Sequence, residues 1–292
     1  MSPEPTPAGT PAPPRRRMTT GQRLLFLLVG WLIVLMPFLF WWNTWFGRRL
    51  TDQQLQEYLH DDKKPRHIQH ALVQLGDRMA NHDADAARWY PDLARLSTYR
   101  VEEVRNTDAW VMGQDATSKP ASEAGFHQTL LKMLNDPSVL VRGNAALSLV
   151  RFGDPAGRPQ IVALLMPAAI TAPQSGKIVD TSTAGTPIHQ NGVVAKLQDA
   201  GQTLEVRSPI GGRLLNLDAH TGQTVAAGDP IASVAPASEQ AWEALRALYL
   251  VGQSPDLPAV QPYERDLPDI PDHVRQQAVL TEKAIRQRAS TH

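Results

Sequence analysis

The 292-residue sequence contains no cysteine. This absence excludes disulfide bonds, thiolate zinc sites, iron–sulfur clusters and cysteine nucleophiles. An excess of one charge is also missing, because 29 lysine and arginine residues balance 29 aspartate and glutamate residues. A protein that binds nucleic acid through its phosphates is expected to carry a basic surface, which this composition does not indicate. We therefore expect no nucleic acid partner.

Catalytic motifs are missing as well. The sequence has no His-Glu-x-x-His motif, no Gly-x-Ser-x-Gly motif and no glycine-rich phosphate loop ahead of a helix. His67 and His70 lie near Asp61 and Asp62, where a metal site is conceivable. A polar, capped helix start on a solvated face accounts for these residues better, since no metal-binding motif accompanies them. We predict a protein without enzymatic activity, metal or cofactor.

The N-terminal region has two parts. Residues 1–23 are rich in proline and contain a run of arginines, and we expect a disordered cytoplasmic tail. Residues 24–42, LLFLLVGWLIVLMPFLFWW, carry no charge. At about 1.5 Å per residue this segment matches a hydrocarbon core of about 30 Å, so we predict one uncleaved transmembrane helix. More arginines precede the segment than follow it, which predicts a single-pass protein of the bacterial inner membrane with a periplasmic C-terminal part.

Residues 51–166 show short amphipathic helices separated by Asp, Asn, Gly and Pro. The dipeptide Val-Arg recurs here and near the C-terminus, followed each time about one turn later by an alanine. The occurrences are Val104-Arg105 with Ala109, Val141-Arg142 with Ala145, and Val274-Arg275 with Ala278. Such self-similarity predicts a helical repeat.

The segment Leu130–Asp154, LLKMLNDPSVLVRGNAALSLVRFGD, resembles the HEAT repeat, an antiparallel helix pair. That family has an aspartate in the turn between the helices and a basic residue early in the second helix, and Asp136 and Arg142 match these positions. Asp136 is then expected to accept hydrogen bonds from backbone N–H groups and to pair with an arginine of its own or a neighbouring repeat. Stacked helix pairs usually present a large surface to another protein, although an ordinary α-helical domain without a binding role stays open.

Residues 168–236 change character, with many Val, Ile, Thr and Gly residues and frequent turn residues, which predicts short strands joined by tight turns. This segment contains a duplication, because the stretch that begins at Ala172 parallels the one that begins at Ser208. Glycines recur at corresponding places, namely Gly176 with Gly212, Gly185 with Gly222 and Gly192 with Gly228. The duplication predicts two similar halves in a flattened barrel with quasi-two-fold symmetry.

The segment resembles the biotinyl/lipoyl-like barrel, also called the barrel-sandwich hybrid. Residues 206–236 are similar to its second half in periplasmic adaptor (membrane fusion) proteins, with the recurring residues Pro209, Gly212, Gly222, Val225 and Gly228. Carriers of this fold attach a cofactor to a lysine on the hairpin between the halves. The hairpin here has Ala200-Gly201 at its tip and no lysine, while Lys196 lies upstream on a strand. The resemblance therefore implies an unmodified docking module without biotin or lipoate.

Residues 238–289 return to a helical period, so we expect C-terminal helices that close the helical array around an inserted barrel. The predicted fold is multidomain: a single N-terminal transmembrane helix, an α-helical HEAT-like array and an inserted all-β lipoyl-like barrel. We predict a non-catalytic, membrane-anchored adaptor or scaffold of an envelope transport or secretion assembly, with a transporter permease or channel among its protein partners. A general envelope interaction scaffold unrelated to transport and a divergent biotin or lipoyl carrier are the alternatives.

Overall fold

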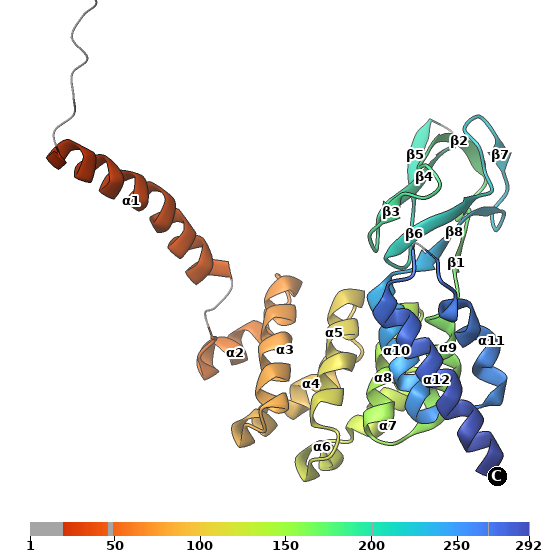
Figure 1. The fold of residues 1–292 in the computed structure, drawn as a ribbon, viewed down its shortest axis with the longest axis horizontal. Coiled ribbons are helices and arrows are strands. Elements are labelled where there is room, and N and C mark those ends of the chain that lie inside the picture. The colour runs from red at the N-terminus through yellow and green to blue at the C-terminus, as the bar shows by residue number, and fades with distance from the viewer. Residues whose placement is uncertain (1–19, 46–48, 200, 268, 292) are drawn as a thin grey trace, which may run out of the picture. The chain divides into compact units, whose positions relative to one another are not determined.

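The computed structural model describes residues 20–45, 49–199, 201–267 and 269–291. These residues belong to two compact units, Met1–Leu50 and Thr51–His292 (Figure 1). The first unit contains helix α1, Thr20–Trp45, on which apolar side chains such as Leu27 are exposed. Residues 1–19, where the sequence predicts most of a disordered tail, lie outside the described residues.

The structure corrects the membrane prediction. A helix that crosses a bilayer needs roughly 20 consecutive, predominantly apolar residues. Within the described residues, no helix combines the necessary length with the necessary hydropathy. The prediction of a transmembrane anchor over residues 24–42 is therefore wrong. The prediction of a single-pass inner-membrane protein with a periplasmic C-terminal part is wrong for the same reason.

The helices of the second unit follow one another as pairs of a first and a second helix. A short connection joins the members of the first three pairs, whereas strands over residues 168–236 separate α9 from α10. The pairs are α2 (Asp52–Leu59) with α3 (Pro65–Ala80), α4 (Tyr90–Leu96) with α5 (Glu102–Met112), α7 (Phe126–Met133) with α8 (Val139–Arg151), α9 (Arg158–Ala163) with α10 (Ser238–Val251), and α11 (Leu257–Val260) with α12 (Asp272–Thr291). Shorter elements lie between them: η1 (Ala84–Trp89), η2 (Gly113–Asp115), α6 (Lys119–Glu123), η3 (Pro155–Gly157), η4 (Ser254–Asp256) and η5 (Gln261–Glu264).

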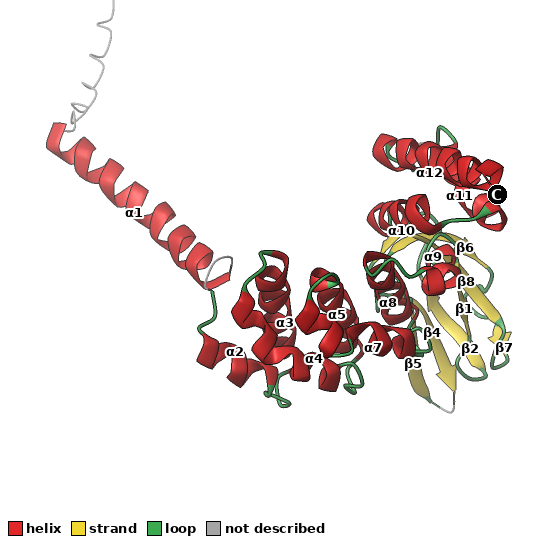
Figure 2. Cartoon of the chain, turned by 90° about the horizontal axis from the view of Figure 1, so that it is seen from below, coloured by secondary structure: helices red, strands yellow, loops and turns green. Residues whose placement is uncertain are grey.

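The second helices stack in the order α3, α5, α8, α10 and α12, each against the next. Figure 2 shows α3, α5 and α8 in one row, with α2, α4 and α7 lying along one side of it. The stacking buries the apolar stripes that the sequence shows, including Val104, Val141 and Val274 and the alanine that follows each of them. The predicted helical repeat is therefore confirmed.

Residues 168–236, the β module, form two four-stranded antiparallel sheets. The strands are β1 (Ala168–Thr171), β2 (Gly176–Thr181), β3 (Pro187–Ile188), β4 (Val193–Asp199), β5 (Gln202–Arg207), β6 (Gly212–Leu217), β7 (Thr224–Val225) and β8 (Pro230–Pro236). The sheet orders are β1-β8-β6-β3 and β5-β4-β2-β7. Moving each strand number by four converts one order into the other, so the two halves of the module are related by a pseudo-two-fold axis.

Matching hydrogen bonds join the two halves. The Gly185 N–H donates to the Leu214 carbonyl oxygen at 2.7 Å, and the Gly222 N–H donates to the Ile178 carbonyl oxygen at 2.7 Å. A second matching pair shows that the sequence alignment slips by one residue at Gly192. Gly228, with φ +89°, corresponds to Asn191, with φ +61°, since the Gly228 N–H donates to the Ala172 carbonyl oxygen, just after β1, and the Asn191 N–H donates to the Ser208 carbonyl oxygen, just after β5. Asparagine tolerates this left-handed conformation better than most residues, which is why it can stand where the other half has glycine.

The β module is inserted between α9 and α10 and packs against the array. Val139 and Leu140 at the start of α8 lie against the apolar core of the module. The Gln190 side chain donates to Glu102 at 3.1 Å, and the Asn191 side chain donates to Glu103 at 3.3 Å. The module is therefore held to the N-terminal ends of α5 and α8.

Candidate functional site

Asp136 lies in the turn between α7 and α8, and its carboxylate joins two repeats. Arg105 of the preceding pair donates to both carboxylate oxygens, at 2.7 Å from Nε and 2.9 Å from Nη2. The Ser138 N–H also donates to Asp136, at 2.8 Å. Of the two partners that the sequence left open, the structure shows the arginine of the neighbouring repeat. Burial would raise the pKa of Asp136, but the Arg105 and Ser138 hydrogen bonds and the nearby positive charge hold that pKa below its usual value.

The position of Arg142 close to Asp136 suggests that the two side chains pair, but the structure shows a different contact. Its guanidinium donates to backbone carbonyl oxygens of the turn, at 2.6 Å to Asp136 and 2.9 Å to Pro137. Arg105 makes the equivalent contact to the Tyr99 carbonyl oxygen, also six residues earlier, at 2.8 Å. Both arginines therefore fix the turn before their own helix. These contacts stabilise the turns of the array.

The glycines of the β module also serve the fold. A Cβ atom on Gly212 would lie 1.7 Å from the Ala235 carbonyl oxygen, and one on Gly176 would lie 2.7 Å from Leu197. Gly222 and Gly228 have φ +93° and +89°, in the left-handed region. They need glycine for their backbone conformation rather than for space. All four thus permit the close strand approach and tight turns of the two halves.

The hairpin between β4 and β5 contains Gly201, with φ +83°, and the lysine nearest to it in the sequence is Lys196. Lys196 lies on β4, and its Nζ atom is 3.1 Å from Asp180 Oδ2 on β2. The amine therefore lies on the body of the sheet and away from the hairpin tip. Residue 200 is outside the described residues.

Two of the histidines near the start of the array, His60 and His67, form pairs with carboxylates, whereas His70 Nε2 lies 2.8 Å from the Gln74 amide nitrogen. His67 Nδ1 lies 2.8 Å from Asp61 Oδ2, and its ring stacks on Tyr58 with centroids 4.2 Å apart. His60 Nε2 lies 3.1 Å from Asp92 Oδ1. Over the described ranges, no group of three or more His, Cys, Asp or Glu side chains is placed to hold a metal ion.

Two carboxyl groups have raised pKa values within the array. Asp108 on α5 is fully buried, and neither of its oxygens has a hydrogen-bond partner among the described residues. Burial raises the pKa of Asp108 well above its usual value, against the opposing charge of Arg95. The side chain of Glu264 forms a hydrogen bond with Glu282 of α12. Burial together with this hydrogen bond raises the pKa of Glu264 to about 7. Neither group lines the cavity described next.

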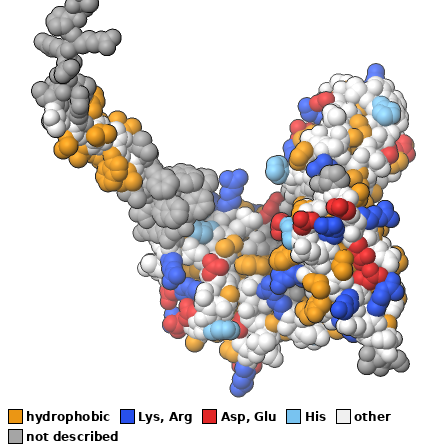
Figure 3. All heavy atoms as spheres, in the orientation of Figure 1, with side chains coloured by type: hydrophobic (Ala, Val, Ile, Leu, Met, Phe, Trp, Pro, Cys, Tyr) orange, Lys and Arg blue, Asp and Glu red, His pale blue; other side chains and the backbone are white. Residues whose placement is uncertain are grey.

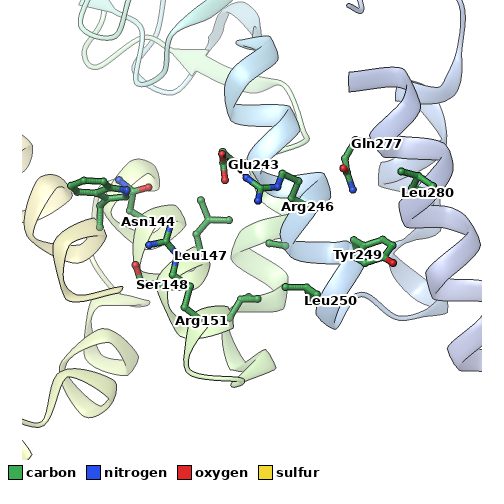
Figure 4. Close-up of a pocket in the computed structure, with 13 residues that line it drawn as sticks. Asn144, Leu147, Ser148, Arg151, Glu243, Arg246, Tyr249, Leu250, Gln277 and Leu280 are labelled. Carbon is green, nitrogen blue, oxygen red and sulfur yellow. Dashed lines mark hydrogen bonds and ion pairs between the residues drawn. The ribbon is translucent and has the colours of Figure 1, made fainter. Parts of the chain in front are cut away.

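A groove of about 610 Å³ opens along the second helices of the array. Its walls come from α5 and α8, which precede the β module in the chain, and from α10 and α12, which follow it. In Figure 4 the side chains of Leu147 and Arg246 point into the space between α8 and α10. Asn144, at one side of the groove, donates from Nδ2 to Asn106 Oδ1 at 2.8 Å and so ties α8 to α5.

Apolar side chains on the C-terminal side of the groove are unusually exposed. The exposed fractions are 43% for Tyr249, 62% for Leu250 and 52% for Leu280. On the face shown in Figure 3, hydrophobic and basic side chains lie side by side over this part of the array. A cluster of exposed apolar side chains in a concave surface is typical of an interaction site. We call this surface, lined by α5, α8, α10 and α12, the concave groove.

The sequence does not predict the concave groove. Its one available signal is the run Ala247–Val251, which is wider than the apolar stripe that a single buried helix face requires. Ala247 and Leu248 are buried, whereas the two residues that follow them are exposed. Which of these apolar residues face solvent depends on the packing of α10 against α8 and α12.

Comparisons with known proteins find similar structures but no family. No protein family model and no curated protein matches the chain. The complex of CpcE and CpcF of phycocyanin lyase from Nostoc is 17% identical, with a TM-score of 0.40, over 83% of this chain and 67% of that chain. A designed armadillo repeat protein in complex with a peptide is 15% identical, with a TM-score of 0.40, over 79% of this chain and 80% of that chain. At these values we draw no argument from the similarity, and the assignment of a helical repeat rests on the helix packing.

Proposed function

We propose that this protein is a non-catalytic adaptor whose helical array binds a partner protein in the concave groove. The observation that carries the proposal is the combination of a cavity of about 610 Å³ with the exposed side chains of Tyr249, Leu250 and Leu280. Apolar surface of this kind contributes roughly 25 cal/mol per Å² when a partner covers it. Exposed fractions near one half leave much of that contribution available for binding.

The charged pairs elsewhere in the array support a role in binding rather than in catalysis. Asp136 and Arg105 are occupied by each other and by the neighbouring turn. The His60 and His67 rings each have a carboxylate neighbour on the surface near α2 and α3, and the part of the chain that the structure describes holds no group of three such side chains placed for a metal ion. We propose on this basis that the chain is not an enzyme.

We further propose that the β module is an unmodified barrel of the lipoyl-like type and serves as a second docking surface. The pseudo-two-fold relation of its strand orders supports this proposal, as does the ion pair that holds Lys196 to Asp180 away from the hairpin. Intact-mass measurement of the protein purified from its own source tests the proposal. We expect the mass of the unmodified chain; a biotinyl or lipoyl adduct on Lys196 would instead favour the divergent carrier.

The role in an envelope transport assembly was predicted together with a membrane span. Because no span is found in the described residues, we propose the adaptor without a membrane and without a permease or channel as its partner. As a general interaction scaffold or as an adaptor, the protein would bind a partner in the concave groove. Only the adaptor would bind a second partner through the β module.

Site-specific photo-crosslinking tests the use of the concave groove. A benzophenone amino acid replaces Leu250, which is 62% exposed in the groove, and in a matched variant it replaces Val73, which is 44% exposed on α3 outside the groove. We expect a partner adduct from position 250 and none of the same mass from position 73. Equal adducts from both positions, or none from position 250, would contradict the proposal.

A further inference from the structure

Arg151 lies in the concave groove without an acidic partner. It is exposed in the last turn of α8, and its guanidinium donates to the Gly113 carbonyl oxygen at 3.4 Å, a long hydrogen bond. It forms no ion pair with any aspartate or glutamate in the described part of the chain. A guanidinium presents several donors in a fixed plane, which suits a carboxylate that approaches from outside.

Arg246 supplies a second positive charge, from α10 on the opposite wall. Its guanidinium lies 4.6 Å from the centroid of the Trp242 ring, which orients the side chain. Glu243 lies 3.3 Å away, but the two side chains are 52% and 47% exposed. Exposed ion pairs of this kind contribute little to stability, so Arg246 can exchange Glu243 for another carboxylate. The groove thus has two guanidinium groups against one carboxylate.

The apolar part of the groove lies beside these charges. Leu250 and Leu280 are on α10 and α12, and Leu147 is on α8. The surface therefore offers an apolar contact and two positive charges within one cavity. Its chemistry is complementary to a segment that carries acidic residues next to an aliphatic one.

We infer that the concave groove binds an acidic peptide segment of a partner protein, with carboxylates against Arg151 and Arg246 and an aliphatic side chain against Leu250 and Leu280. This inference rests on the proposed function of the groove and adds the chemistry of its partner. The chain's own N-terminal segment is a poor occupant on grounds of charge, because residues 1–19 contain three arginines and one glutamate.

Selection from a random peptide library displayed on phage, against the purified full chain, tests the inference without a known partner. We expect selected peptides to be enriched in Asp and Glu beside Leu or Ile. The double variant Arg151→Glu with Arg246→Glu is expected to reverse the enrichment to Lys and Arg. Arg213→Glu, the same substitution at one exposed position of β6 outside the groove, is the control for charge reversal elsewhere on the surface and is expected to select the parent set.

Fluorescence anisotropy measures the affinity of one selected peptide for the parent protein and for each single variant, and so gives the size of each substitution's effect on binding. We expect Arg151→Glu to weaken binding at least tenfold and Arg213→Glu to change it less than twofold, with the difference shrinking at high salt. Circular dichroism melting curves that match the parent show that each variant is folded. Peptides without acidic enrichment, or equal binding by the two single variants, would overturn the inference.

The outcomes separate this inference from the proposed function. Selection of apolar or basic peptides that lose binding with Leu250→Glu supports the groove as a docking site and rejects the acidic partner. Selection of no peptide that depends on Leu250 or Arg151 rejects both. Stronger binding after deletion of residues 1–19, or a dimer by light scattering that Leu250→Glu dissociates, assigns the groove to the chain itself and also overturns the inference.

Discussion

The ion pair between Asp136 and Arg105 gives the sharpest test of how the array is held together. Only 8% of the Asp136 side chain and 13% of the Arg105 side chain are exposed. Removing one member of such a pair leaves the other charge buried, which typically costs about 3–5 kcal/mol. Arg105 keeps its bond to the Tyr99 carbonyl oxygen, which offsets part of that cost. We therefore expect Asp136→Ala to lower the free energy of unfolding by about 3 kcal/mol.

Urea unfolding followed by far-UV circular dichroism measures this change. The double variant Arg105→Met with Asp136→Ala should lose much less than the sum of the single variants, because neither charge is then buried alone. The pKa of Asp136 is below its usual value of 3.8, so its contribution is present above that pH and is lost as the pH falls through the folded-state pKa. A loss below about 1 kcal/mol at pH 7, or strict additivity in the double variant, would refute the reasoning.

Further predictions concern groups outside the concave groove. Asp108→Leu should raise the free energy of unfolding by about 1–3 kcal/mol, because it removes a buried carboxyl that has no hydrogen-bond partner among the described residues. Because the pKa of Asp108 is raised, this gain in stability should be larger at pH 8 than at pH 4. A gain that is independent of pH would count against the reasoning. The pKa of Glu264 is raised to about 7 beside Glu282, so its contribution to stability should fall as the pH rises from 4.5 to that value. In urea titrations at pH 5 and pH 8, Glu264→Gln should reduce the fall and leave the part that Asp108 contributes. Gly212→Ala should cost at least about 2 kcal/mol because its Cβ meets a backbone carbonyl oxygen, whereas Gly211→Ala, with ordinary contacts, should be nearly neutral; equal thermal shifts would contradict this.

The helical repeat could be predicted because its signals are local. A stripe of apolar residues at helical spacing and an aspartate in the turn before Arg142 are visible without knowledge of the packing. The partner of Asp136 could not be chosen in the same way, since Arg105 and Arg142 both follow a valine in similar surroundings. The choice depends on the distance between neighbouring repeats, which the sequence of one repeat does not contain.

The β module shows a subtler limit. Alignment of the two halves by their glycines correctly pairs Gly176 with Gly212 and Gly185 with Gly222. It then paired Gly228 with the wrong residue, because the equivalent left-handed position is held by Asn191. An alignment by residue type detects a shared backbone conformation only when both halves use the same residue. The hydrogen bonds to the neighbouring strand detect the conformation itself.

The concave groove is the feature that the sequence predicts least. Its walls on α8 and α10 are separated in the chain by α9 and the whole β module. Tyr249 and Leu250 contribute little to folding, since they stay exposed beside the buried Leu248. Folding therefore gives no reason for an apolar pair beside a guanidinium without an acidic partner, and binding does. Charge reversal at Arg151 separates the two, because the loss of a favourable charge in the last turn of α8 should change the free energy of unfolding by no more than about 1 kcal/mol while binding of an acidic segment falls tenfold.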